Sequence, residues 1–361
     1  MEFDSTLIAQ FWHLVGHRSE FARSGDFIRF QTVVGDIVVF NDGKSVVAFD
    51  NLCPHRGARI FGAPYGNSPA TCPYHGWTHR AGRIFVARKE RFSECDTQGA
   101  SLNFLQTEWL GDFLFVSIEP RTSLAQQLGD LGTRLIEISA NINGRQDFDS
   151  YKYDCYWPIA VENALEPYHI DLIHPQTLGL LNIGDGENVY FGYNSVWQAP
   201  ILEPRSEKIL KSLNKFFNIS NQYQGYEFIY LFPFSMISST FGYSYSIQNF
   251  IPINNNETSF YSRLFTSRVR DAAAQRALSS FFASTADINR QVFTEDHDVC
   301  KLVPTQSWSM QPLRFAADNE AKIQHFREAC RAHWENQIGH LNYETYDGLY
   351  QSPRTRFVVR R

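Results

Sequence analysis

The chain has 361 residues, of which 43% are hydrophobic and 20% are charged, so it can bury a core large enough for two domains. Its net charge of -5 provides no broad basic field for nucleic acid. The first residues are acidic where a secretory signal would be basic, and no apolar run approaches the roughly 20 residues that cross a bilayer. We therefore expect a cytoplasmic protein that binds neither nucleic acid nor membrane.

Strand patterns dominate the first third of the chain. Residues 27–40 and 45–49 are rich in β-branched and aromatic side chains, with turn residues at 41–43 between them. Residues 113–118 look like a closing strand, and Pro120 then interrupts the pattern. Short strands with glycine and proline turns favour a small β-sandwich in this part of the chain.

Two mixed cysteine and histidine pairs lie among these strands. Cys53 and His55 form the first pair, and sixteen residues separate His55 from the second pair, Cys72 and His75. A [2Fe–2S] cluster with two histidine ligands needs both cysteines on one iron and both histidines on the other, so two mixed loops must face each other. A structural zinc site is the alternative, but zinc modules usually pair like with like. The spacing therefore predicts a [2Fe–2S] cluster held by these four residues.

The two halves resemble the Rieske signature, C-x-H followed by C-x2-H, with the aromatic Trp77 after the second histidine's glycine. From this point the chain resembles the catalytic alpha subunit of Rieske non-haem iron oxygenases over almost its whole length. The resemblance implies an α+β fold with a Rieske β-sandwich domain over residues 1–120. It also implies a helix-grip catalytic domain over residues 121–361, in which an antiparallel sheet curls round a long helix.

A second group of ligand types follows about a hundred residues later. Asn163 and Glu166 have the spacing of a capping box, so we expect a helix to begin here. Pro175 disfavours an α conformation at the residue before it, which places His174 at the helix end. His169 and His174 would lie about 140° apart on a regular helix, so both can reach one ion only if the backbone changes course. A helix end at His174 provides that change.

Two histidines and one carboxylate are the typical ligands of non-haem Fe(II) oxygenases. In the resembling family the carboxylate comes from a later helix that carries a Glu-Asp pair, and residues 295–298 match it within a helical-looking stretch, 286–302. We predict Asp296 as the third iron ligand and keep Asp298 as the alternate. A short acidic run by itself is usually a solvated helix face, so the prediction depends on the two histidines.

Glu166 lies one helical turn before His169 and so on the same face of a helix. In the resembling family this position is usually aspartate, and it links an iron-binding histidine to a Rieske histidine of the neighbouring subunit. A glutamate here is shared with the branch that acts on quaternary amines such as carnitine and choline. The longer side chain still accepts hydrogen bonds from two imidazoles, so we predict that Glu166 keeps the linking role.

The later part of the chain has the features of an α+β domain. Strands are predicted over residues 226–234, 239–253 and 258–268, with a hairpin turn at 254–257. A C-terminal amphipathic helix is predicted from the helical spacing of Ile323, Phe326, Cys330, Trp334 and Ile338. Eight aromatic residues are expected to line a pocket that suits a flat aromatic substrate or a trimethylammonium group. They are Tyr190, Tyr193, Trp197, Phe228, Tyr230, Phe241, Tyr243 and Phe250.

The resemblance implies a small-molecule substrate, O2, electrons from NAD(P)H through a separate reductase or ferredoxin, and a head-to-tail homotrimer. We predict an oxidoreductase that hydroxylates or oxidatively demethylates a small organic substrate, and we prefer monooxygenation. The alternatives are a cis-dihydroxylating dioxygenase of aromatic rings and a Rieske electron-transfer protein whose second domain binds a ligand. A reducing compartment fits the remaining cysteines, which form no C-x-x-C pair: Cys95, Cys155, Cys300 and Cys330.

Overall fold

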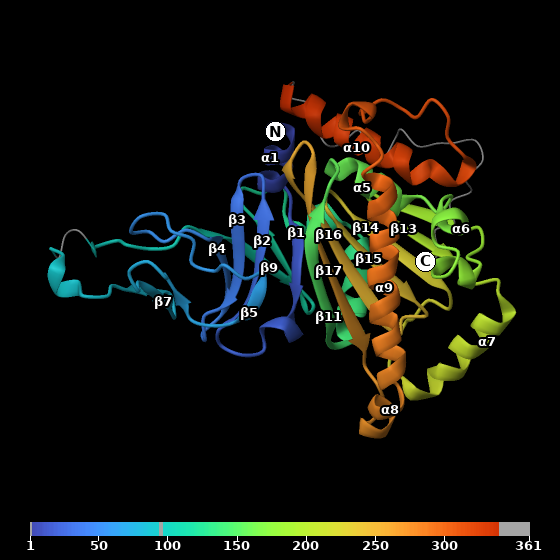
Figure 1. The fold of residues 1–361 in the computed structure, drawn as a ribbon, viewed down its shortest axis with the longest axis horizontal. Helices are drawn as coiled ribbons and strands as arrows, with labels where there is room; N and C mark the ends of the chain where they lie inside the picture. The colour runs from blue at the N-terminus through green and yellow to red at the C-terminus, as the bar shows by residue number, and fades with distance from the viewer. Residues whose placement is uncertain (1, 94–96, 339–361) are drawn as a thin grey trace.

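The computed structural model describes residues 2–93 and 97–338, and the strands in these ranges form three antiparallel sheets (Figure 1). Two sheets have seven strands each and make up the body of the molecule, whereas the third has three strands and lies in an extension on one side. In spatial order the first large sheet contains β1 (His13–His17), β10 (Phe113–Ser117), β9 (Phe104–Leu110), β4 (Val46–Asp50), β3 (Gly35–Asn41), β2 (Asp26–Thr32) and β5 (Tyr65–Asn67). The small sheet contains β6 (Ala70–Thr71), β7 (Thr78–Arg80) and β8 (Arg83–Phe85).

β2 and β3 form a hairpin inside the stretch, residues 27–40, that was predicted as strand. The chain reverses at residues 33–34, where Thr32 Oγ1 donates to the Gly35 carbonyl at 2.7 Å. Gly35 has a φ of +120°, which favours glycine. The strand content is confirmed, but two valines occupy the turn and hide the reversal from a pattern based on β propensity.

The second large sheet presents one face to the long helix α9 (Ser279–Cys300) (Figure 1). The rings of Phe260 on the sheet and Phe293 on the helix lie 4.9 Å apart, so apolar packing holds the two layers together. This arrangement confirms the predicted α+β class. In spatial order the sheet contains β11 (Ile142–Tyr153), β17 (Glu257–Ser267), β16 (Ser244–Asn254), β15 (Ser235–Thr240), β14 (Tyr226–Leu231), β13 (Asn194–Ala199) and β12 (Glu187–Phe191).

The hairpin turn predicted at residues 254–257 is confirmed, because it joins β16 to β17. The stretch 239–253 was predicted as one strand and instead contains the turn from β15 to β16. Phe241 and Gly242 both have positive φ there, at +57° and +70°. The aromatic residue at the turn made the sequence look continuous with a strand.

The other helices lie around the large sheets (Figure 1). They are α1 (Glu2–Gln10), α3 (Leu124–Leu128), α4 (Leu131–Asn141), α5 (Trp157–Leu165), α6 (Ile170–Ile173), α7 (Pro204–Leu213), α8 (Ala272–Ala277) and α10 (Ala321–Ile338). The amphipathic helix predicted near the end is confirmed as α10, because Ile323, Phe326 and Cys330 are buried. The Phe326 ring lies 5.6 Å from Trp157 on α5 and 5.9 Å from Tyr230 on β14.

A buried ionic cluster joins the two large sheets. Arg263 on β17 is fully buried, and its Nη1 atom donates to the Val15 carbonyl at 2.7 Å and to Glu20 Oε2 at 3.2 Å. Arg145 donates to the other oxygen of Glu20 at 2.8 Å. A buried guanidinium is costly without such partners, so the cluster is stable only when the two sheets are packed together.

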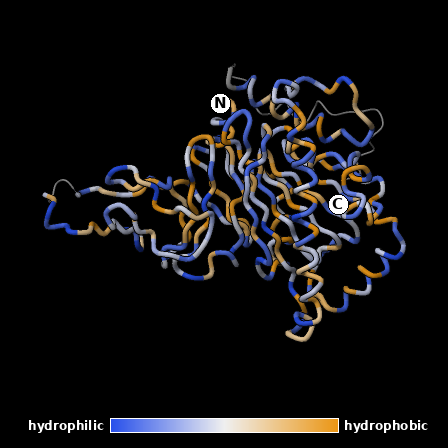
Figure 2. Tube along the Cα trace, viewed as in Figure 1, coloured by the Kyte–Doolittle hydropathy of each residue, from blue (hydrophilic) through white to orange (hydrophobic). Residues whose placement is uncertain are grey.

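Each described strand up to β10 lies in the first large sheet or the small sheet, and each strand from β11 onward lies in the second large sheet. The division of the chain into residues 1–120 and 121–361 stays a prediction. Apolar segments run through the strands of both large sheets, where the buried cores lie (Figure 2). Within the described ranges, no helix has the length and apolar character of a membrane span.

Candidate active site

Two similar loops bring the predicted cluster ligands together. Cys53 and Cys72 are only 3% and 2% exposed. Gly57 N–H donates to the Cys53 carbonyl at 2.8 Å, and Gly76 N–H donates to the Cys72 carbonyl at 2.9 Å. Both glycines have positive φ, at +69° and +73°, so each loop closes in a conformation that favours glycine. The two loops thus repeat one backbone design around each cysteine.

The histidines of the two loops also lie side by side. The ring centroids of His55 and His75 are 4.7 Å apart, and the Trp77 indole stacks on His55 at 4.8 Å. Nδ1 of His55 is buried and has no hydrogen-bond partner among the described residues. Burial raises the pKa of the Cys53 thiol, and the neighbouring Cys72 thiol raises it further. The loops thus present a buried imidazole nitrogen beside two buried thiols, which are the donor types of a cluster with mixed nitrogen and sulfur ligands.

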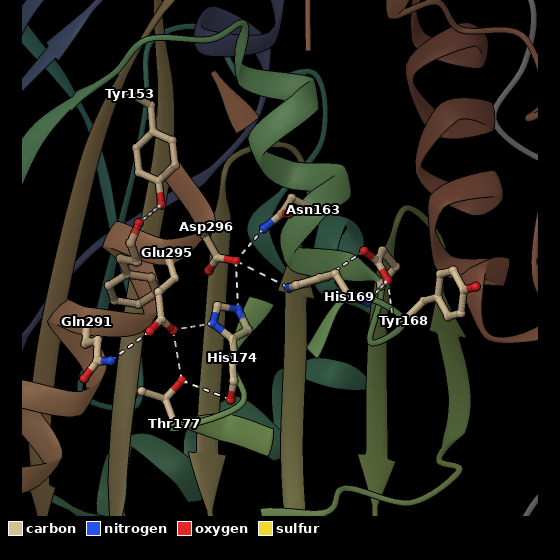
Figure 3. Close-up of polar contacts among 11 residues, drawn as sticks. Tyr153, Asn163, Tyr168, His169, His174, Thr177, Gln291, Glu295 and Asp296 are labelled. Carbon is tan, nitrogen blue, oxygen red and sulfur yellow. Dashed lines mark hydrogen bonds and ion pairs between the residues drawn. The ribbon is translucent and has the colours of Figure 1, made fainter. Parts of the chain in front are cut away.

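A second donor set lies between α6 and α9. One ligand atom from each of His169, His174 and Asp296 lies within 4.8 Å of the others. Asp296 Oδ1 is 3.0 Å from His174 Nε2 and 3.4 Å from His169 Nε2, as Figure 3 shows. Asp298 is not brought to this group and instead pairs with Lys301 on the outer side of α9. The structure therefore brings together the three residues that were predicted as iron ligands.

Carboxylates orient both histidines from behind. Glu166 Oε1 accepts from His169 Nδ1 at 2.6 Å, and Glu295 Oε2 accepts from His174 Nδ1 at 2.7 Å (Figure 3). Thr177 Oγ1 also donates to Glu295 at 3.0 Å. With each Nδ1 engaged, both Nε2 atoms are left to face Asp296, which is the arrangement that metal-binding histidines usually have. Glu295 was not predicted as a site residue, although it is adjacent to Asp296 in the sequence.

The charges of this group are strongly coupled. Burial by itself would lower the pKa of His169, yet the contacts with Asp296 and Glu166 raise it to about 9. Burial would raise the pKa of Asp296, yet the two histidines in turn lower it to about 2. Without a metal, a carboxylate surrounded by imidazoles is balanced by protons, and a divalent cation would take their place.

The helix around the first histidine differs from the prediction. The sequence predicted a helix beginning near Asn163, but Asn163 lies in the last turn of α5, and Glu166 follows the helix end with extended backbone. Pro158 at the start of α5 was the overlooked signal, because proline is favoured in the first turn of a helix. Asn163 Nδ2 donates to Asp296 Oδ1 at 2.7 Å, so this side chain serves the site rather than a helix cap. The predicted helix end at His174 is confirmed, since His174 caps α6.

A cavity of about 250 Å³ opens beside the three donors. Of the eight aromatic residues expected to line it, Trp197 and Phe228 do so, and the other six pack elsewhere. The lining also includes Tyr226, Phe293 and the buried Lys322, none of which the sequence marked. Lys322 gave no signal because it lies on the amphipathic helix α10, where a lysine usually faces solvent.

Two family models match the chain. The model described as Ring hydroxylating alpha subunit (catalytic domain) matches residues 144–336, and the model described as Rieske [2Fe-2S] domain matches residues 11–91. The chain belongs to the ring hydroxylating alpha subunit family. The predicted N-terminal Rieske domain and C-terminal catalytic domain are confirmed by these two matches.

Curated relatives match part of this alpha subunit. It is 30% identical over 177 residues to the carnitine monooxygenase oxygenase subunit of Escherichia coli (strain K12), which covers 47% of each chain. It is 29% identical over 175 residues to the anthranilate 1,2-dioxygenase large subunit of Acinetobacter baylyi, covering 45% of this chain and 37% of that one. The chain spans about half the length of the curated relatives it matches.

Solved structures share the fold of the alpha subunit. The crystal structure of the quaternary ammonium Rieske monooxygenase CntA in complex with L-carnitine matches with a TM-score of 0.69 at 19% identity, covering 92% of both chains. A naphthalene 1,2-dioxygenase bound to indole matches with a TM-score of 0.67 at 18% identity, covering 92% of this chain and 89% of that chain. At these identities the likeness shows the fold alone.

The family implies a Rieske [2Fe–2S] cluster and a mononuclear Fe(II). The unpartnered His55 Nδ1 and the two buried thiols fit a cluster with mixed sulfur and nitrogen ligands. Two imidazole Nε2 atoms with one carboxylate oxygen fit Fe(II) in an oxygenase site with open positions.

Proposed function

We propose that the chain is the oxygenase component of a Rieske non-haem iron monooxygenase that hydroxylates or oxidatively demethylates a small organic substrate. The observation that carries this proposal is the convergence of both histidine Nε2 atoms on Asp296, beside a largely apolar cavity. His169, His174 and Asp296 would hold the iron, and Cys53, His55, Cys72 and His75 would hold the cluster. When bound, these groups supply oxygen activation and one-electron transfer.

The chain's own residues prepare the site in three ways. Glu166 and Glu295 hold the two histidines in the tautomer that presents Nε2 to the metal. Asn163 Nδ2 donates to Asp296 Oδ1 and so limits rotation of that carboxylate. Leu178, Phe293 and other apolar side chains of the cavity exclude water from the reacting carbon.

We propose a head-to-tail homotrimer as the functional assembly. The cluster loops and the donor set of α6 and α9 lie toward opposite ends of the long axis of the chain (Figure 1). Exposed apolar residues lie beside both sites, with Tyr74 57% exposed at the cluster loops and Tyr168 and Leu172 65% and 77% exposed near Glu166. A neighbouring chain that covers these residues would bring its cluster to Glu166, which is then placed to link the two centres.

The electrons are proposed to come from NAD(P)H through a separate reductase or ferredoxin, and the location is proposed to be cytoplasmic. The location is supported by Cys155, Cys300 and Cys330, which are buried free thiols. Cys155 and Cys300 lie close enough for their thiols to interact, which in an oxidising compartment would favour a disulfide. Cys95 lies outside the described residues.

A cis-dihydroxylating dioxygenase is the second candidate, because the anthranilate 1,2-dioxygenase large subunit is among the relatives. The electron-carrier alternative needs no mononuclear site, so the donor set on α6 and α9 counts against it. Metal analysis separates an oxygenase from a carrier, since about three irons per chain fit the first and about two fit the second. Turnover of a substrate panel with a generic reductase under 18O2 then separates the oxygenases. One labelled oxygen, in the hydroxylated product or in the aldehyde released by demethylation, fits monooxygenation, and two in one product fit dihydroxylation.

A further inference from the structure

The cavity contains a buried cation that the proposed mechanism does not use. Lys322 is the second residue of α10, and only 2% of its surface is exposed. Its Nζ atom lies 4.4 Å from the centroid of the Trp197 ring and 5.1 Å from that of Phe228. No hydrogen bond or ion pair joins Lys322 to another residue in the described part of the chain.

This position is unfavourable for a lysine on two grounds. A buried ammonium without a hydrogen-bonded acid loses its hydration, and contact with two rings compensates for only part of that loss. A positive charge in the first turn of a helix also opposes the helix dipole. Burial lowers the pKa of Lys322 to about 7, although the charge of Glu166 opposes this shift. The fold gains nothing evident from the charge, so a ligand is the natural explanation for it.

The neighbours of Lys322 indicate the charge of that ligand. Trp197 and Phe228 are paired across β13 and β14, and both rings already face the ammonium group of the protein. A trimethylammonium group could not stack on the same ring faces without displacing Lys322 against charge repulsion. The ligand group at this end of the cavity is therefore negative or neutral, and a single cation matches a single negative charge.

Hydroxyl donors continue from this end along the sheet. Phe228 is paired with Ser238, and Ser238 with Ser246, so the three lie in one row across β14, β15 and β16. Gln248 Nε2 donates to both serine hydroxyl oxygens, at 3.1 Å and 2.9 Å, and Ser238 also hydrogen-bonds to Tyr226, so it is the Ser246 hydroxyl that keeps its own proton to donate. Both serines line the cavity. A carboxylate accepts from an ammonium and from hydroxyls, so it matches this set of donors.

We infer that the substrate carries a carboxylate, and that Lys322 binds this carboxylate at the Trp197 and Phe228 end of the cavity. A phosphate is disfavoured, because the described residues that line the cavity include no arginine to form a bidentate pair. The orientation rests on the proposed function, which places the reacting carbon at His169, His174 and Asp296. Both an aromatic acid and a trimethylammonium zwitterion carry a carboxylate. In the zwitterion, the methyl groups would point toward His169, His174 and Asp296.

Calorimetry on the iron-replete full chain tests the inference with two matched ligand pairs. Benzoate is compared with benzamide, and glycine betaine with choline, so that each pair differs mainly in the carboxylate. We expect the acid of one pair to bind about 10- to 100-fold more tightly than its partner, as for a hydrogen bond to a charged group. The pair that responds identifies the aromatic acid or the zwitterion as the source. Equal affinity within both pairs, or no binding of either acid, would overturn the inference.

Three variants locate the effect. Lys322→Met keeps the length of the side chain without its charge, and it should abolish the preference for the acid while iron content and thermal midpoint are retained. Lys322→Arg keeps a charge and should retain the preference, and it serves as the second variant if the methionine form does not fold. Lys208→Met removes an exposed lysine of α7 and should change nothing. A full preference in Lys322→Met would refute the role of Lys322. Failure of the proposed function is a separate result, because it would appear as about two irons per chain whatever the ligand affinities.

Discussion

Replacing Glu295 with alanine removes the carboxylate that accepts from His174 Nδ1 at 2.7 Å. The His174 side chain is fully buried and depends on this carboxylate to fix its orientation, so without it the imidazole is free to rotate or change tautomer. Loss of such a partner typically lowers metal affinity about 10- to 100-fold. That factor corresponds to about 1.4 to 2.8 kcal/mol of binding free energy.

The assay is a competition titration of Fe(II) against a chelator, with the visible absorbance of the cluster as an internal measure of folding. We expect Glu295→Ala to lose affinity at the mononuclear site while cluster absorbance stays at the level of the parent chain. Asp298→Ala is the matched control, because Asp298 lies three residues along the same helix and pairs only with the exposed Lys301 in the described part of the chain. Equal iron affinity in Glu295→Ala and the parent chain would refute the orienting role, and a loss in Asp298→Ala would refute the choice of Asp296.

Three further predictions use the same protein. Asp296→Ala should reduce iron from about three to about two per chain with cluster absorbance unchanged, and retention of the third iron would contradict its assignment as a ligand. Glu166→Ala should keep the cluster and lower turnover about 10- to 100-fold, whereas near-normal turnover would remove the linking role. Carboxylate binding should weaken as pH rises through about 7, because the free chain must then take up a proton at Lys322 before it can pair with the anion. The affinity should stay constant across that range in Lys322→Arg, and a parent chain with no pH dependence between pH 6 and 9 would argue against this proton uptake.

The ligand residues could be predicted from the sequence because their spacing is itself the chemical requirement. Cys53, His55, Cys72 and His75 lie in two short loops, so local spacing brings each pair together before any tertiary packing is known. Asp296 was harder to predict, because the choice between it and Asp298 depends on which side of α9 faces the two histidines. Tertiary packing fixes the rotation of α9 about its axis. It also brings Glu295 to His174, which lies 121 residues away in the sequence.

The pocket was predicted less well than the ligands. Expected lining residues such as Tyr230 and Tyr243 are fully buried in the core, because a strand pattern does not tell which face of a sheet covers a cavity. Lys322 could not have been identified, since the sequence suggests a solvated position on an amphipathic helix. The helix start expected at Asn163 was wrong because Pro158, which marks the start of α5, was overlooked. For the cavity lining and for Lys322, long-range packing decided what the local pattern could not.

The guanidinium of Arg263 restricts how the two large sheets can move relative to each other, and this bears on electron transfer in the proposed trimer. Producing the parts on either side of residue 120 as separate chains would remove Val15 and Glu20 from Arg263 and expose the face along which the two large sheets pack. Neither fragment is then expected to be soluble on its own, and swinging of the cluster-bearing part about a hinge would incur the same penalty. In the proposed trimer the electron is therefore expected to cross between docked subunits, and its rate should depend on the geometry of assembly rather than on a hinge motion within one chain.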